Sequence, residues 1–229
     1  MLRGDSVTRD MFAELIRGAV DGAVTSQMAR RAQEPPISTR VASALEKRLD
    51  GVTINDYRVT VVAQDFPDRG SGSWEHKSGV DLYIGIRVET AGVPFAISKG
   101  LLIQAKKAKR IVKTSLRTSE SDEQEDLIDQ CGKMLARTDK GAFVWVYGAG
   151  GTHVVPASEV LKQQFVPPEY LVGRNVAEQF RDVLDCFSGD TGLVAPDIFE
   201  SDFALAAFLE EIAVRRGVTI KLAPTKRRG

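Results

Sequence analysis

The chain has 229 residues, of which 43% are hydrophobic and 27% are charged, and 31 basic residues balance 31 acidic ones. This composition suits a folded protein with a sizeable core, and no apolar run approaches the ~18 residues that a membrane-spanning helix needs. Cys131 and Cys186 are too few and too far apart for a disulfide framework. The first residues lack the apolar stretch of a secretion signal, so we expect a cytoplasmic protein without a membrane partner.

The N-terminal third predicts two helices and a strand. Apolar residues recur at three- and four-residue steps over 11–28, which predicts an amphipathic helix of about twenty residues that ends before the prolines at 35–36. A shorter helix is expected over 38–49. Alternation over 58–62 predicts a first strand, and the polar, glycine-rich stretch 64–73 then reads as a loop.

Residues 81–107 predict a β-hairpin. In the first run the even positions 82–88 are apolar while the odd positions are mostly polar or small, which is typical of a half-buried strand. In the second run the odd positions 101–105 are apolar. Between them, the segment 90–94 contains glycine and proline, which favour a turn.

The parity of this hairpin places three polar side chains together. If both apolar sets are buried on one side, Asp81, Gln104 and Lys106 share the opposite face. Centring the reversal near 92–94 sets Asp81 across from Lys106, with Gln104 on the diagonal. Cross-strand neighbours lie about 5 Å apart at Cβ and diagonal ones about 7–8 Å, which is close enough to share one ion.

These residue types suit a magnesium site. Mg²⁺ prefers oxygen ligands, typically one or two carboxylates together with water and substrate phosphate oxygens. We expect ligands from Asp81, Gln104 and the Ala105 carbonyl, with Glu75 as a second carboxylate. Lys106 would orient the attacking water or stabilise negative charge in the transition state of phosphodiester hydrolysis.

Glu75, Gly79-Val80-Asp81 and Gln104-Ala105-Lys106 together resemble the active-site pattern of the PD-(D/E)XK nuclease superfamily. The glutamine variant is similar to that of the Mrr-like restriction endonucleases. The resemblance covers about residues 40–160, in the order helix, strand, catalytic hairpin, helix, strand. In two positions the chain departs from the common pattern: Val80 replaces a frequent proline, and Gln104 replaces a carboxylate, which makes Glu75 more necessary or metal binding weaker without substrate.

The resemblance implies an α/β fold with a restriction-endonuclease-like mixed central β-sheet, flanked by helices and preceded by an N-terminal helical extension. It implies a metal-dependent endonuclease that hydrolyses phosphodiester bonds in DNA, with Mg²⁺ as cofactor and Mn²⁺ as a substitute. A role in restriction or anti-phage defence, with other defence-system proteins as partners, follows from the family alone. Cutting both strands with one site per chain would favour a homodimer.

Two other functions remain open. The same fold can lose its chemistry and persist as a nucleic-acid-binding or scaffold module, and the same metal site can cut RNA.

A basic run accompanies the second strand of the hairpin. Seven basic residues and no acidic one lie between Lys99 and Arg117. A basic edge beside a metal site suits a phosphate backbone, although a solvated surface is the alternative. The nucleic-acid contacts that we expect are Lys107, Lys109, Arg110 and Lys113.

The remaining chain predicts further helices and strands. An apolar stripe over 127–135 indicates a helix, on which Gln130 belongs either to the site or to the exposed surface. The run 142–147 predicts a strand buried on both faces, and 153–155 another. Helices are expected from 156 and over 203–212, and a short strand over 218–222. We therefore divide the chain into an N-terminal helical extension (1–36), a nuclease-like core (37–165) and a mostly helical C-terminal region with a short strand and a basic tail (166–229).

Overall fold

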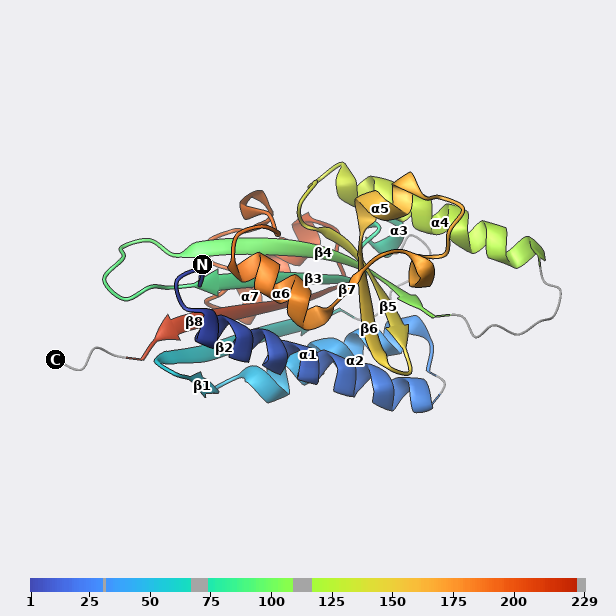
Figure 1. The fold of residues 1–229 in the computed structure, drawn as a ribbon. Helices are drawn as coiled ribbons and strands as arrows, with labels where there is room; N and C mark the ends of the chain where they lie inside the picture. Colours follow the sequence, from blue (N-terminus) through green and yellow to red (C-terminus); the bar gives the residue numbers. More distant parts are fainter. Residues whose placement is uncertain (31, 67–73, 109–116, 226–229) are drawn as a thin grey trace.

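The computed structural model describes residues 1–30, 32–66, 74–108 and 117–225 (Figure 1). The helices are α1 (Ser6–Ala29), α2 (Glu34–Leu49), α3 (Trp74–Ser78), α4 (Arg117–Leu135), α5 (Ala157–Lys162), α6 (Val176–Leu184) and α7 (Asp202–Glu211), with 3-10 turns η1 (Pro168–Tyr170) and η2 (Thr191–Leu193). The strands are β1 (Thr53–Ile54), β2 (Tyr57–Asp65), β3 (Leu82–Val88), β4 (Ile97–Lys107), β5 (Ala142–Gly148), β6 (Gly151–Pro156), β7 (Arg174–Asn175) and β8 (Arg216–Pro224). None of these described helices combines the length and apolarity that crossing a bilayer requires.

The described strands form one mixed sheet in the order β1-β2-β8-β3-β4-β5-β6-β7. Strands β3 and β4 are antiparallel, β4 and β5 are parallel, and β8 runs parallel to β3 but antiparallel to β2. The expected α/β class, with a mixed sheet flanked by helices, is confirmed.

Helices cover both faces of this sheet. On one face α1, α2 and α6 pack through a core that includes Phe12 and Phe180. On the other face α4, α5 and α7 contribute residues such as Met134, Val160 and Leu205. Figure 1 shows α1 and α2 side by side along the sheet, with α4 and α5 grouped on another side. The sheet is therefore the middle layer of three.

Strand β3 is buried on both faces, whereas its alternation predicted a half-buried strand. Leu82 and Ile84 pack under α1 and α2, and Tyr83 on the opposite face is also fully buried. The Tyr83 ring lies 5.2 Å from that of Phe208 on α7, and its hydroxyl donates to the carbonyl of Leu193. The sequence prediction was wrong here because an aromatic residue with a polar tip can be buried once its hydroxyl finds an acceptor.

Strand β8 lies near the middle of the sheet, between β2 and β3. It comes from the segment expected as a mostly helical C-terminal region, and α1, from the expected N-terminal extension, covers the same sheet. Its pairing with β2 extends from Tyr57↔Pro224 to Asp65↔Arg216. Elements of all three expected regions therefore build the layers around the hairpin.

Candidate metal site at the end of the hairpin

The register of the β3–β4 hairpin brings Asp81 beside Gln104. The ladder pairs Val88 with Ile97 and Leu82 with Ile103, and the Asp81 N–H donates to the Ile103 carbonyl at 2.9 Å. The expectation that Asp81 lies across from Lys106 was wrong by two residues. The chain reverses between Gly92 and Val93, one residue earlier than assumed. Moving the centre of a hairpin turn by one residue changes the residue opposite a given position by two. Because a shift of two preserves the face, the predicted parity is confirmed.

Asp81 is held by two donors from β4. Its Oδ2 atom accepts a hydrogen bond from Gln104 Nε2 at 2.7 Å and another from the Ala105 N–H at 2.8 Å. These bonds form because β3 begins at Leu82, so the β3–β4 ladder stops before it reaches Ala105. The carboxylate of Asp81 thus replaces the missing strand partner.

The site is closely packed. Asp81 is 4% exposed and Gln104 is fully buried. Gln104 Nε2 also lies 3.3 Å from the Ala105 carbonyl oxygen, so one amide group contacts two oxygens. Within the described residues, Gln104 Oε1 is buried and has no hydrogen-bond donor. An unpaired buried acceptor is unfavourable, which makes this oxygen a candidate ligand for a cation.

Lys106 lies on the same face of β4 as Gln104, two residues further on. It is half-buried and close to Cys131 of α4. Burial raises the pKa of the Cys131 thiol to about 12, and the positive charge of Lys106 acts in the opposite direction. Lys106 thus lies on the face of β4 against which α4 packs.

Lys107 takes the other face of β4. Its ammonium donates to the Ala32 carbonyl at 2.9 Å, in the connection between α1 and α2. It therefore lies on the opposite side of the sheet from Asp81, which its expected grouping with the other nucleic-acid contacts did not take into account. Lys109, Arg110 and Lys113, the other expected nucleic-acid contacts, lie outside the described residues. Lys99, at the start of the basic run, is buried and donates to the Ser188 carbonyl, and burial lowers the pKa of its ammonium.

Glu75 belongs to the short helix α3, which the sequence did not predict and which follows the stretch 64–73 that was expected as a loop. Its side chain lies outside the described part, so its expected role as a second carboxylate stays a prediction. Helix α3 is fixed next to the site at its C-terminal end. The Ser78 hydroxyl donates to the Trp74 carbonyl and accepts from the Val80 N–H, and Gly79 has a φ of +71°.

Gln130 is the residue that the sequence left undecided. Its backbone packs against Gly79, where an added Cβ would lie 2.5 Å from the Gln130 carbonyl oxygen. Its Oε1 atom is buried and lacks a donor among the described residues. Gln130 is therefore partly enclosed rather than simply exposed. The helical stripe alone could not reveal this, because the contact depends on how closely α4 approaches the chain just before Asp81.

The donor set fits a hard cation with few protein ligands. Among the described residues no group of three or more histidine, cysteine or acidic side chains gathers in one place. What the site offers is one carboxylate, from Asp81, the Ala105 carbonyl and the orphan oxygen of Gln104. Mg²⁺ characteristically binds through one or two carboxylates and keeps several waters, so the residues present fit that ion.

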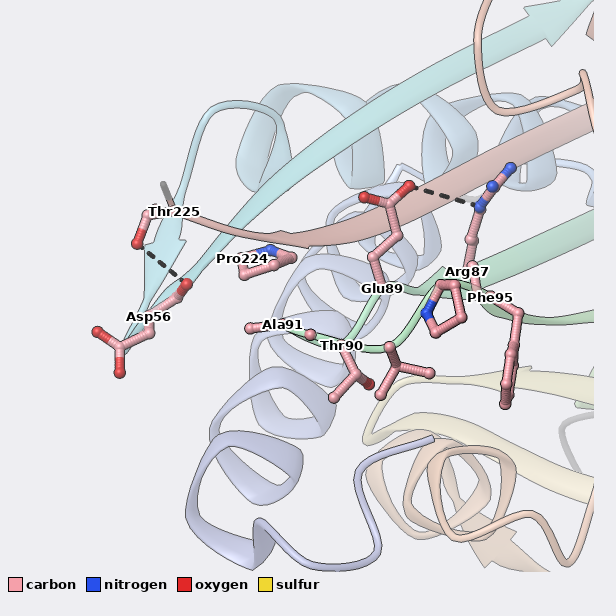
Figure 2. A pocket seen from close by; sticks show the side chains of 12 residues that line it. Asp56, Arg87, Glu89, Thr90, Ala91, Phe95, Pro224 and Thr225 are labelled. Atoms are coloured by element: carbon pink, nitrogen blue, oxygen red, sulfur yellow. Dashed lines mark hydrogen bonds and ion pairs between the residues drawn. The ribbon is translucent and has the colours of Figure 1, made fainter. Parts of the chain in front are cut away.

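A separate hollow of about 1020 Å³ lies at the far end of the same hairpin (Figure 2). The turn between β3 and β4 lines it together with the end of β8. The Glu89 carboxylate faces Arg87 there at 3.6 Å, and the Thr225 hydroxyl donates to the Asp56 carbonyl at 3.0 Å. It contains none of the predicted site residues.

Comparison with known proteins gives no match: no family model, curated protein or solved structure matches this chain.

Proposed function

We propose that the chain is a metal-dependent endonuclease that hydrolyses phosphodiester bonds in DNA. The observation that carries the proposal is the joint placement of Asp81, Gln104 and Lys106. The first two are hydrogen bonded at the open end of the β3–β4 ladder, and Lys106 extends from the same face. A carboxylate with neutral oxygens and a nearby ammonium is the set of groups that metal-assisted phosphodiester hydrolysis uses.

Each residue has a distinct role in this proposal. Asp81 and the Ala105 carbonyl would hold Mg²⁺, or Mn²⁺ in its place, with Gln104 as a neutral ligand and Glu75 as the second carboxylate. The bound ion would supply Lewis acidity toward the phosphate and a lower pKa for a bound water. Lys106 would donate hydrogen bonds to the attacking water or to the phosphate oxygens that gain charge. Lys109, Arg110 and Lys113 would neutralise the DNA backbone.

The order of elements supports the resemblance to the PD-(D/E)XK nucleases. Helix α2, strand β2, the β3–β4 hairpin, helix α4 and strand β5 follow one another as that resemblance implies. The insertion of β8 between β2 and β3 is a feature of this chain that the sequence pattern did not suggest. Restriction or defence against foreign DNA is the setting that we propose on the same resemblance, with a homodimer cutting both strands.

One observation favours a second candidate, a nucleic-acid-binding module of the same fold. Asp81 is only 4% exposed, and a catalytic carboxylate must reach its substrate. In such a module the Asp81–Gln104 bond would simply stabilise the hairpin.

A cleavage assay separates the two candidates. Purified protein is incubated with supercoiled plasmid and Mg²⁺ or Mn²⁺, with EDTA as the blank, next to Asp81→Asn. The control variant is Asp129→Asn, which changes an exposed acid of α4 that pairs with Lys133. The nuclease proposal expects metal-dependent nicking that Asp81→Asn loses and Asp129→Asn retains. Binding without nicking under every metal would favour the module, and preferential cutting of an RNA competitor would reassign the substrate.

A further inference from the structure

The Gln104 amide points its nitrogen where a metal site needs an oxygen. Nε2 contacts Asp81 Oδ2 at 2.7 Å and the Ala105 carbonyl oxygen at 3.3 Å, and both oxygens belong to groups that we propose as cation ligands. The amide NH₂ thus brings partial positive charge to a position between them. Gln104 Oε1, on the same carbon, is buried without a donor in the described part of the chain.

Turning the amide over would convert this hydrogen-bonded arrangement into a set of ligands. The NH₂ group and the oxygen of an amide have nearly the same size, so a half-turn exchanges them without repacking the buried side chain. Oε1 would then lie near the present position of Nε2, 2.7 Å from Asp81 Oδ2. Two adjacent ligands of an octahedral Mg²⁺ ion, each at ~2.1 Å, lie about 3.0 Å apart. The exchange would therefore create a suitable spacing, whereas two oxygens at this distance repel each other without a cation.

We infer that Gln104 is a cation-dependent latch on Asp81: its NH₂ group holds the carboxylate when no cation is bound, and the amide inverts so that its oxygen becomes a ligand when one binds. This inference rests on the proposed function only in assuming that the site takes a divalent cation. It gives a physical reason for an amide at position 104. A glutamine keeps the empty site hydrogen bonded, whereas a glutamate would set two negative groups against each other.

The test compares Gln104→Glu with the wild-type chain by thermal unfolding, with EDTA and with millimolar Mg²⁺. Without the cation, the variant should unfold about 5 °C or more below the wild type, because it loses the donor and gains repulsion. Mg²⁺ should recover most of that loss and should shift the wild type much less. The double variant Asp81→Asn, Gln104→Glu should lose the recovery.

The matched control is Gln179→Glu on the other face of the sheet. Gln179 is also a buried amide, 1% exposed, and its Oε1 accepts from Trp145 Nε1 at 3.0 Å. A carboxylate placed there should lower the melting temperature by a similar amount, and Mg²⁺ should not restore it. Equal recovery in both variants, or none in Gln104→Glu, would overturn the latch.

A second readout on the wild-type chain needs no variant to fold. The side-chain NH₂ resonances of Gln104, followed by ¹⁵N NMR, should shift and lose protection from exchange when Ca²⁺ is added in place of a catalytic metal. Unchanged NH₂ resonances, at Ca²⁺ concentrations that shift the Ala105 amide, would contradict inversion. Neither readout involves DNA cleavage, so the two proposals can fail separately. If the amide inverts on cation binding but the protein does not nick DNA, only the nuclease proposal is refuted. If the protein nicks DNA but the Gln104 amide does not invert, only the latch is refuted.

Discussion

Asp81 and Gln104 meet where the β3–β4 ladder ends, and Gln104 Nε2 donates to Asp81 Oδ2 at 2.7 Å. Both residues are almost completely buried. The bond joins two strands outside their regular backbone pairing. It therefore fixes the start of β3 relative to β4 and places a carboxylate beside the Ala105 backbone. A structural pairing and a candidate ligand set use the same atoms.

The close approach of α4 to the chain before Asp81 predicts that Gly79 cannot be replaced. Gly79 has a φ of +71°, and an added Cβ would lie 2.5 Å from the carbonyl oxygen of Gln130. Backbone strain and this clash should together lower the free energy of unfolding of Gly79→Ala by about 2–4 kcal/mol, measured by urea denaturation. Gly132→Ala is the control, since nothing lies within 4 Å of its added Cβ and the helix should gain about 0.5–1 kcal/mol. Equal effects of the two substitutions would show that α4 does not pack as described.

The buried thiol of Cys131 predicts a loss of stability at alkaline pH. Burial raises its pKa to about 12, whereas the unfolded thiol titrates near 8.5. Below pH ~8.5 both states keep the proton and stability is unaffected, but above it only the unfolded state releases the proton. The free energy of unfolding should therefore fall by about 1.4 kcal/mol per pH unit from this group until pH reaches about 12.

Cys131→Ala isolates this contribution. The variant should be less stable at neutral pH because it leaves a small cavity. Its stability should nevertheless fall less steeply than that of the wild type between about pH 9 and about pH 10.5, a range that lies between the unfolded and folded pKa values of the Cys131 thiol. Tyr83 remains in both proteins, so its own raised pKa cancels in the comparison. Parallel pH profiles would mean that the Cys131 thiol titrates normally in the folded chain.

The contact between α1 and α6 predicts a cost for losing Arg9. Its guanidinium lies 2.7 Å from the Asp185 carboxylate, and the two side chains are 20% and 15% exposed. Arg9→Met should lower the free energy of unfolding by about 1 kcal/mol, because Asp185 would be left partly buried without its partner. Lys162→Met removes an exposed ion pair of the same length with Glu159 and should leave stability unchanged. A chemical denaturation series that ranks the two variants the other way would refute this assignment.

The sequence predicted those features that depend on local pattern. Alternation on both strands indicated which face carries Asp81, Gln104 and Lys106, and the apolar run at β5 indicated its burial on both sides. The exact partner of Asp81 could not be derived, because it depends on where an eight-residue connection reverses. A single residue of error at the turn changes the opposing residue but not the face.

Features that depend on distant pairing were not predictable from local pattern. The stretch that forms β8 reads as a strand, yet nothing in its sequence says that it inserts between β2 and β3. The burial of Tyr83 depends on α7, which lies more than a hundred residues later. The separation of Lys106 from Lys107 does follow from strand alternation, and the basic run obscured it because charge was counted along the chain rather than by face.

The decisive measurement compares Lys106→Met with Lys107→Met in single-turnover DNA cleavage. The two neighbours have the same charge but lie on opposite faces of β4, so only Lys106 can reach a phosphate held near Asp81. Lys106→Met should slow cleavage by about a hundredfold or more while DNA binding changes by about threefold at most. Lys107→Met should cleave at close to the wild-type rate. Undiminished cleavage by Lys106→Met, or equal losses in both variants, would contradict a catalytic site on this face of the sheet.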